Sequence, residues 1–249
     1  MKTVGLIPAR LESSRLRRKL LLSETGQPLI QHTWQVAAGC PDLDEVIVAT
    51  DSHEIAAAVE AFGGHAELTA EHPSGTDRIA EVVRRSCPDA DIVVNIQGDE
   101  PELEPETISA LVQCLKTGSS EMATVATPFH SAEAVRDPSC VKVVVNDRGE
   151  AMYFSRSPIP FVRDRPIEEI LNGDSHPFLL HLGMYAFRRD FLLQMTQMPR
   201  GDSEQLECLE QLRPLQSGAR IAVAIVSEAA IGIDTPRDYA AFVERMKSR

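Results

Sequence analysis

The stretch DIVVNIQGD, residues 91–99, is the most hydrophobic strand that the sequence predicts, and it decides the fold class. A short apolar run of this kind is typical of a strand in a parallel sheet, where helices cover both faces. The run ends on the polar residues Gln97, Gly98 and Asp99. A buried strand therefore delivers a flexible residue and a carboxylate to one end of the predicted sheet.

The segments on either side of this stretch alternate between strand and helix patterns. Short apolar runs predict strands, and amphipathic runs that follow them predict helices. Ser52 is the expected N-cap of one of these helices. This βαβαβα order predicts an α/β fold with a mostly parallel sheet and right-handed crossovers. The predicted strands are residues 3–8, 45–51 and 91–99, and the predicted helices are 29–39, 52–64 and 104–118.

The pattern changes after a further predicted strand at residues 121–129. Residues 140–156 alternate like two antiparallel strands, with a hairpin turn at residues 146–149. A proline-rich stretch follows, and then the α/β pattern returns. We therefore expect a mixed subdomain at 130–200 inserted into a core formed by 1–129 and 201–249. The returning elements are a helix over 202–218, a strand over 221–227 and a helix over 235–249.

The composition excludes several classes of protein. The 249 residues carry 25 Lys and Arg against 37 Asp and Glu, a formal charge of −12, so a nucleic-acid partner is not expected. No run of about 18 apolar residues is present, which argues against a membrane span. The N-terminus lacks the features of a secretory signal. Five scattered cysteines without a C-x-x-C pair fit reduced thiols, so we expect a cytoplasmic protein.

The first polar cluster follows the strand at residues 3–8. In an open parallel sheet, ligands bind beyond the carboxyl ends of the strands. The loop there carries five cations, Arg10, Arg15, Arg17, Arg18 and Lys19, and such a loop can hold a polyphosphate, although a solvated loop is the alternative. Arg17 and Arg18 fit the solvated alternative better, because not every cation in so short a loop can face inward.

The second cluster is the segment HPSGTDR, residues 72–78. Ser74 and Gly75 at the start of a helix offer a hydroxyl and free backbone N–H groups to a phosphate or a base. The alternative is an ordinary helix cap made by Ser74 or Thr76. Arg78 lies in the first turn, where the helix dipole disfavours a cation, and this indicates that an anion is close by.

Two further clusters supply carboxylates. Asp99 follows the buried strand, where a hard cation such as Mg²⁺ is commonly held by one or two carboxylates and by substrate phosphates. Asp234 lies in GIDTP, residues 232–236, near the end of the chain. The alternatives are a turn aspartate for Asp99 and the N-cap of the last helix for Asp234. The dinucleotide motif G-x-G-x-x-G and the P-loop motif are both absent.

Taken in order, these segments resemble a known family. The motifs LIPAR, SGTDR, VVNIQGDEP, YFSRSPIP, HLGMYAF, LEQLR and IGIDTPRDYAAF follow one another along nearly the whole chain. Together they are similar to the 3-deoxy-manno-octulosonate (Kdo) cytidylyltransferases, which act in lipopolysaccharide biosynthesis. The resemblance implies a Rossmann-like nucleotidyltransferase sheet, a dimerisation subdomain and a homodimer. It also implies transfer of CMP from CTP to the anomeric hydroxyl of Kdo, with release of pyrophosphate.

The resemblance also implies roles for individual residues. Asp99 and Asp234 would bind Mg²⁺ and, with Arg10 and Lys19, would form the catalytic set. No side chain is named as a general base, because a metal-activated sugar hydroxyl needs none. The implied nucleotide-binding residues are Arg10, Arg15, Lys19, Ser74, Gly75 and Gln97, and the implied sugar-binding residues are Arg78, Arg156, His181, Tyr185, Glu210 and Gln211.

The chain departs from the family in its first loop. The family has the pattern L-P-G-K-P-L, whereas residues 16–21 here read LRRKLL. The loss of a glycine and two prolines changes the backbone conformations open to the loop, and with them the direction of Lys19.

Alternatives remain for the sugar site and for the activity. His181 could be structural, Tyr185 could belong to the core, and Arg156 could be paired with an acid. For the activity, the alternatives are a cytidylyltransferase for sialic acid or amino-Kdo and a non-catalytic nucleotide-binding protein.

Overall fold

The computed structural model describes residues 1–13, 15–173 and 176–248. Contacts between Cα atoms divide the chain into two compact units. Unit 1 comprises residues 1–109 and 230–249, and unit 2 comprises residues 110–229. The mixed subdomain that the sequence predicts at 130–200, with its role in dimerisation, stays a prediction. Each unit is described in turn.

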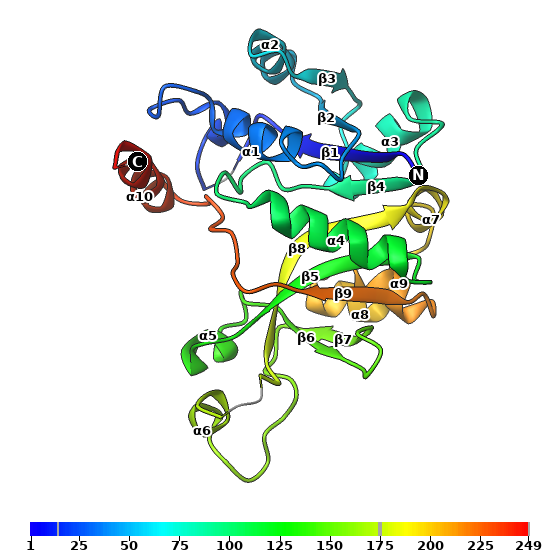
Figure 1. The fold of residues 1–249 in the computed structure, drawn as a ribbon, viewed down its shortest axis with the longest axis vertical. Coiled ribbons are helices and arrows are strands. Elements are labelled where there is room, and N and C mark those ends of the chain that lie inside the picture. Colours follow the sequence, from blue (N-terminus) through cyan, green and yellow to red (C-terminus); the bar gives the residue numbers. More distant parts are fainter. Residues whose placement is uncertain (14, 174–175, 249) are drawn as a thin grey trace. The chain divides into compact units, whose positions relative to one another are not determined.

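Unit 1 contains a parallel sheet with the order β3-β2-β1-β4 (Figure 1). Its strands are β1 (Thr3–Ala9), β2 (Glu45–Thr50), β3 (His65–Leu68) and β4 (Ile92–Asn95). Every residue of β4 is buried, which fits the continuous apolar run at this position. The predicted α/β class with a mostly parallel sheet is confirmed, while β3 was not anticipated.

Helices connect and cover these strands. Helix α1 (Leu29–Ala38) contacts β2, α2 (His53–Ala61) contacts β2 and β3, and α3 (Gly75–Ser86) contacts β1, β2 and β4. The hydroxyl of Ser52 accepts a hydrogen bond from the backbone N–H of Ile55, so the predicted N-cap of α2 is confirmed. Helix α4 (Pro105–Thr117) follows β4. The short 3₁₀ helix η1 (Lys19–Leu21) lies in the basic loop.

The C-terminal helix α10 (Pro236–Lys247) joins unit 1 through an apolar cluster. Leu29 of α1 and Ile233, just before α10, pack with residues of α10 itself. This burial brings a segment from the end of the chain to the N-terminal sheet. The buried members of the cluster are Leu29, Ile233, Tyr239, Phe242 and Val243.

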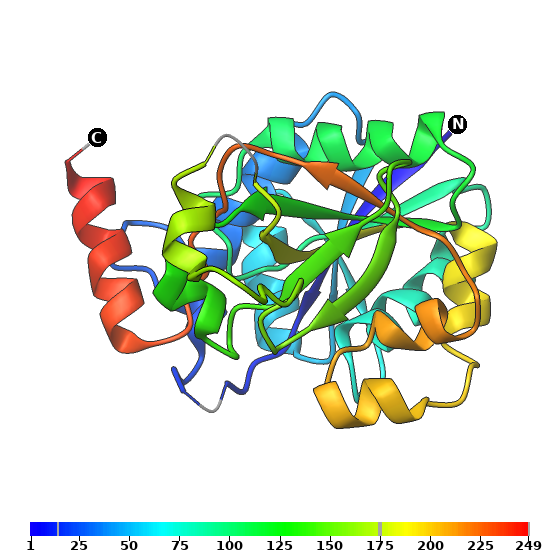
Figure 2. The same cartoon turned by 90° about the horizontal axis from the view of Figure 1, so that it is seen from below.

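In unit 2, strand β5 (Met122–Pro128) pairs with two others. It is antiparallel to β8 (Leu179–Arg188) and parallel to β9 (Ile221–Ile225). Figure 2 shows β9, in orange, alongside β5, in green. Strand β6 (Lys142–Val145) pairs with β8 and forms a hairpin with β7 (Ala151–Ser155). That hairpin confirms the predicted antiparallel pair, and Gly149 takes a positive φ of 73° in its turn.

One predicted helix of unit 2 is wrong. The sequence predicts a single helix over 202–218, but two short helices are present, α8 (Asp202–Glu207) and α9 (Leu212–Gln216). Between them, Cys208 adopts a left-handed backbone with φ of 51°. A buried ion pair, with the guanidinium of Arg213 donating to both carboxylate oxygens of Glu204, spans this break. Pro214 accounts for the break, because it is tolerated in the first turn of α9 but cannot continue a helix that runs through Glu210.

The remaining helices of unit 2 are short. They are α5 (Ala132–Arg136), α6 (Ile167–Leu171) and α7 (Arg189–Met195). Residue 249, which belongs to the predicted last helix, lies outside the described residues. Within the described part of the chain, no helix has the length and apolar character needed to cross a membrane.

Candidate functional site

A pocket of about 440 Å³ opens in unit 1, beside the carboxyl ends of β1 and β4. This is the edge of a parallel sheet at which a ligand site is expected. Every residue of unit 1 to which the sequence assigned a role lines the pocket. These residues are Arg10, Arg15, Lys19, Ser74, Gly75, Arg78, Gln97, Asp99 and Asp234.

The ammonium of Lys19 lies between two carboxylates in this pocket. Its Nζ donates to Asp99 Oδ2 at 2.6 Å and to Asp234 Oδ1 at 3.0 Å. A guanidinium nitrogen of Arg15 lies 3.0 Å from the other oxygen of Asp234. The Lys19 side chain is only 10 % exposed, whereas those of Asp99 and Asp234 are 32 % and 45 % exposed. The two carboxylates therefore converge on one point and remain open to solvent.

Backbone contacts explain why these distant carboxylates meet. The N–H of Ile233 donates to the carbonyl oxygen of Asp99 at 2.9 Å. The hydroxyl of Thr33 on α1 donates to the carbonyl of Gly98 at 3.1 Å, which fixes the turn after β4. The turn with Asp99 and the segment with Asp234 are thus held side by side.

Asp234 is not the N-cap of α10, contrary to one of the two interpretations of this residue. Thr235 takes that position, and its hydroxyl accepts a hydrogen bond from the N–H of Asp238. The carboxylate of Asp238 accepts hydrogen bonds from the backbone N–H groups of Thr235 and Asp234. This capping box leaves the Asp234 carboxylate directed at Lys19 and Arg15.

Two glycines allow close packing around the pocket. A Cβ at Gly98 would lie 3.1 Å from a methyl carbon of Ile7, and a Cβ at Gly75 would lie 3.1 Å from the Pro8 ring. Both distances are tighter than ordinary van der Waals contact. The turn after β4 and the start of α3 therefore approach β1 more closely than a larger residue would allow. Ser74 caps α3 by accepting from the N–H of Asp77, which confirms it as a cap.

The altered loop still presents Lys19 to the pocket. Arg18 adopts a left-handed backbone with φ of 53° and ψ of 31° directly before η1, the conformation that a glycine takes without strain. Its guanidinium pairs with Glu54 at the start of α2. Arg17 and Arg18 are both exposed, which agrees with the solvated position expected for them.

Glu100, next to Asp99 in the sequence, has a buried carboxyl group. Its pKa is raised to about 8, mainly by burial, with the nearby charges of Asp99 and Asp234 contributing in the same direction. The motif GDEP contains this residue, but the sequence offered no sign that its environment differs from that of Asp99.

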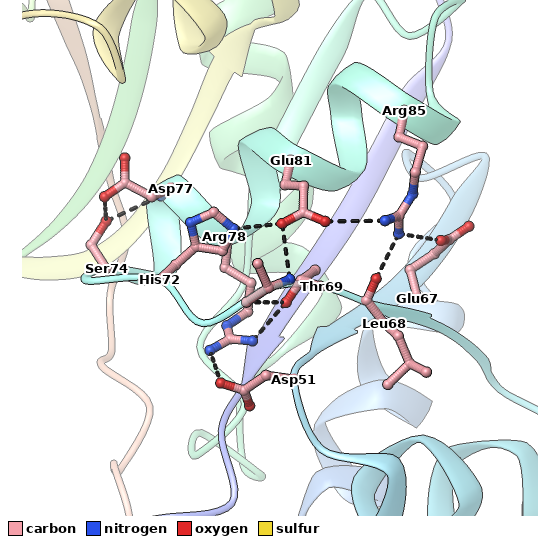
Figure 3. Close-up of polar contacts among 11 residues, drawn as sticks. Asp51, Glu67, Leu68, Thr69, His72, Ser74, Asp77, Arg78, Glu81 and Arg85 are labelled. Carbon is pink, nitrogen blue, oxygen red and sulfur yellow. Dashed lines mark hydrogen bonds and ion pairs between the residues drawn. The ribbon is translucent and has the colours of Figure 1, made fainter.

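The anion beside Arg78 is a carboxylate of the protein itself. Its guanidinium donates to Asp51 Oδ2 at 2.7 Å and to the hydroxyl of Thr69 at 2.7 Å (Figure 3). Asp51 follows β2, so the expected neighbouring anion is a carboxylate from another strand end. In the same figure His72, which also lines the pocket, contacts Glu81 at 2.6 Å. That hydrogen bond lowers the pKa of Glu81.

The other predicted sugar-site residues belong to unit 2. Backbone carbonyl oxygens hold the guanidinium of Arg156: it donates from Nε to Glu207 at 2.7 Å and from one terminal nitrogen to Pro138 at 2.9 Å. The Glu207 carboxylate accepts instead from the backbone N–H of Arg156 and from the Ser155 hydroxyl. Among the described residues, no carboxylate pairs with the Arg156 side chain, so its charge is not neutralised there.

Of the remaining four residues, His181 and Tyr185 lie on β8, and the charge of Glu210 acts on Tyr185. The rings of His181 and Tyr185 lie 5.5 Å apart. Burial lowers the pKa of His181 to about 3. Burial and the charge of Glu210 raise the pKa of Tyr185 well above its usual value. The side-chain nitrogen of Gln211 is buried without a hydrogen-bond partner in the described structure.

Sequence reasoning missed several pocket residues. His72 and Glu12 line the pocket but received no role, and Asp51 was not connected with Arg78. His72 stands in the segment HPSGTDR, whose polar residues were the available signal. Nothing near Asp51 in the sequence indicates its partner 27 positions away.

Comparisons with known proteins place the chain in a family. The family model described as cytidylyltransferase matches residues 4–221. A 3-deoxy-manno-octulosonate cytidylyltransferase of Rhodopirellula baltica is 45 % identical, covering 100 % of both chains. One of Syntrophobacter fumaroxidans is 49 % identical over 98 % of this chain and 96 % of its own.

A solved structure is equally similar over its length. CMP:2-keto-3-deoxy-manno-octonic acid synthetase, determined in complex with CTP, superimposes with a TM-score of 0.91 and 42 % identity. The match covers 100 % of this chain and 99 % of that one. The chain therefore belongs to the 3-deoxy-manno-octulosonate cytidylyltransferase family of cytidylyltransferases.

Proposed function

We propose that the protein transfers CMP from CTP to the anomeric hydroxyl of Kdo and releases pyrophosphate. The observation that carries this proposal is the convergence of Asp99 and Asp234 on Lys19 in a pocket lined by further cations. Such an arrangement suits a triphosphate with a divalent ion. Nucleotidyl transfer depends mainly on positioning and on neutralising the charge that develops at phosphorus.

The residues present fit a magnesium ion. Asp99 and Asp234 provide hard oxygen donors directed at one point, and both are partly open to solvent. The described residues contain no cluster of three or more metal-ligating side chains, so the protein would supply two carboxylates. Mg²⁺ is commonly held in this way, with waters and substrate phosphates completing its shell. When bound, the ion would supply Lewis-acid activation of the phosphate and of the attacking hydroxyl.

The cations of the pocket would hold the triphosphate. Arg10 is exposed at the pocket, and no acidic partner for it is found in the described part of the chain, so it is available to a phosphate. Lys19 and Arg15 already contact carboxylates and would exchange part of these contacts for phosphate oxygens. Ser74, Gly75 and Gln97 would contact the cytosine and ribose.

The acid sugar would be bound by the residues of unit 2. Of the two arginines assigned to it, Arg156 is the better partner for the Kdo carboxylate, because Asp51 already neutralises Arg78. His181, Tyr185, Glu210 and Gln211 offer neutral and acidic groups suited to sugar hydroxyls. Arg78 would act on the sugar through its remaining donors.

Incubation of the protein with CTP, Kdo and Mg²⁺ tests the reaction. Release of pyrophosphate that requires all three components is the expected result, and release no greater than in a no-enzyme control contradicts it. CTP binding by calorimetry without turnover would instead support a non-catalytic nucleotide-binding protein. Parallel assays with sialic acid and amino-Kdo test the choice of acid sugar.

We further propose that the protein acts as a homodimer in the cytoplasm. The free cysteines suit a reducing compartment. Met152 and Tyr153 on β7 and Phe161 after it are exposed apolar side chains that a second copy could cover. Light scattering should give twice the chain mass of 27.4 kDa, and a single-chain mass at micromolar concentration would argue against the dimer.

A further inference from the structure

The pairing of β5 with β8 contains an irregularity beside the candidate sugar site. Val125 pairs with Leu182, but the preceding residue Thr124 pairs with Tyr185. Gly183 and Met184 therefore lie between the two registers, as in a β-bulge. Because the pairing resumes at Tyr185, the bulge brings Tyr185 opposite Thr124 and beside His181.

The hydroxyl of Thr124 fills this irregularity. Thr124 is fully buried, and its Oγ1 donates to the carbonyl oxygen of Met184 at 2.8 Å, with the carbonyl of Leu182 at 3.3 Å. The same oxygen lies 2.9 Å from Nε2 of His181. A hydroxyl has a single proton, and a carbonyl oxygen can only accept. The proton of Thr124 is thus committed to the backbone, and Nε2 of His181 must donate to its lone pair.

The consequence appears on the other nitrogen of the ring. A neutral imidazole carries one N–H, so a proton on Nε2 leaves Nδ1 as an acceptor. Burial keeps the ring neutral by lowering its pKa to about 3. Phe154 contacts the ring edge to face at 4.9 Å and offers no hydrogen bond. Within the described structure, no residue donates to Nδ1.

We propose that Thr124 is a positioning residue that holds His181 in its Nε2–H tautomer, so that Nδ1 accepts a hydrogen bond from a sugar hydroxyl. This inference rests on the proposed function, because it takes His181 as part of the sugar site. A neutral acceptor cannot attract a carboxylate, and it selects a donor group such as a hydroxyl. His181 would then contact a hydroxyl of the acid sugar, and Arg156 would contact its carboxylate.

The tautomer can be measured without any substrate. In protein labelled with ¹⁵N-histidine, long-range ¹⁵N–¹H correlations distinguish the two neutral forms, and the signal that disappears in His181→Gln identifies the residue. The wild type and Thr124→Ser should both show the Nε2–H form at neutral pH. A wild-type His181 that carries its proton on Nδ1, or on both nitrogens, would overturn the proposal whatever the Thr124 variants show.

Kinetics test the effect on the sugar. Thr124→Val removes the hydroxyl at nearly constant shape, so His181 loses its fixed tautomer. The KM for Kdo should rise about tenfold, the size of one lost hydrogen bond, while the KM for CTP stays within about twofold. Thr124→Ser should restore the wild-type KM for Kdo. An unchanged KM for Kdo in Thr124→Val would rule out the positioning role.

A neighbouring threonine supplies the matched control. Thr127 is also buried on β5, and its hydroxyl donates to the carbonyl of Ser227 at 3.1 Å without contacting a histidine. Thr127→Val should therefore leave the tautomer of His181 and the KM for Kdo unchanged. If it raises that KM as much as Thr124→Val does, the effect is general loss of packing and the proposal fails.

Failure of the proposed function has a different signature. In that case no pyrophosphate would form from CTP and Kdo in the wild type, while the tautomer measurement would still give its own answer. If His181 carries its proton on Nε2 but the protein lacks this activity, the role of Thr124 in fixing the tautomer stands. Only the assignment of His181 to Kdo binding is then refuted.

Discussion

Arg18 illustrates at the level of one residue how this chain tolerates its altered loop. Its left-handed backbone costs a residue with a Cβ about 1–2 kcal/mol relative to glycine. The pair with Glu54 is exposed on both sides and recovers at most about 1 kcal/mol. The conformation therefore persists because the neighbouring residues hold it, including Lys19 with its two carboxylates.

Substitutions at Arg18 separate the backbone cost from the ion pair. Arg18→Gly and Arg18→Ala both lose the pair with Glu54, but only glycine relieves the backbone. We expect the glycine variant to exceed the alanine variant in free energy of unfolding by about 1 kcal/mol, measured by urea denaturation. Equal stabilities would show that the left-handed conformation is not strained.

Asp99 should matter far more for turnover than for folding. In Asp99→Asn a carboxylate that we propose binds Mg²⁺ is replaced by a neutral amide of the same shape, while Lys19 keeps its contact with Asp234. We expect kcat to fall at least ~100-fold, the size of a lost charge-stabilising contact, and the unfolding free energy to change by less than about 1 kcal/mol.

Asp190→Asn is a matched control for this change. Asp190 is an exposed aspartate of unit 2, and its carboxylate pairs with the guanidinium of its neighbour Arg189. This variant should retain wild-type turnover. Equal activity of Asp99→Asn and the control would remove Asp99 from the metal site.

Residue types and their positions at strand ends predicted the pocket well. Arg10, Lys19, Asp99 and Asp234 were assigned from such positions, and all line one cavity. The partner of Arg78 could not be predicted, because a contact between Arg78 and Asp51 depends on two crossovers meeting in space. For the same reason the sequence could not reveal that Lys19 lies between both carboxylates.

At the scale of elements, strand β8 carries a buried imidazole whose ionisation is coupled to folding. The pKa of His181 lies near 3 in the folded protein and near 6.5 in the unfolded chain. The unfolded state therefore binds a proton first as the pH falls. The stability that depends on neutral His181 is complete above pH 6.5 and is lost progressively toward pH 3.

His181→Gln should weaken this acid sensitivity. The unfolding free energy of the wild type, relative to the variant, should fall by about 2 kcal/mol between pH 7 and pH 5. Denaturant titrations of both proteins at the two pH values measure the difference. A difference that does not change with pH would mean that water reaches the ring in the folded protein.

Elements with a strong local pattern were predictable, and those that depend on distant contacts were not. β1, β2 and β4 contain apolar runs. β3 has the sequence HAEL, which shows neither an apolar run nor a clear alternation of apolar and polar residues. The break between α8 and α9 has a local signal that the prediction of one helix passed over. Pro214 in the first turn of α9 has no backbone N–H to bond Glu210, so a helix cannot continue regularly through it. The ion pair of Glu204 with Arg213, which spans the break, could not be read from the pattern.

At the scale of the whole molecule, the two substrates should protect different parts of the chain. The pocket residues belong to unit 1, and the sugar candidates other than Arg78 belong to unit 2. Hydrogen exchange with CTP and Mg²⁺ should slow amides near residues 10, 75 and 99. Addition of Kdo should slow amides of β8 and of residues 207–211, with little further change around residue 75. Protection of β8 by CTP alone would contradict this assignment.

The hydrogen bond between Ile233 and Asp99 has a consequence for synthesis of the protein. A ribosome completes the strands of unit 1 more than a hundred residues before it adds Asp234, since that unit's strands end at residue 95. Until then a nascent chain has only one of the two carboxylates that we propose hold a divalent ion. On that proposal the metal site is complete only after Asp234 has been added, and shorter chains would lack it.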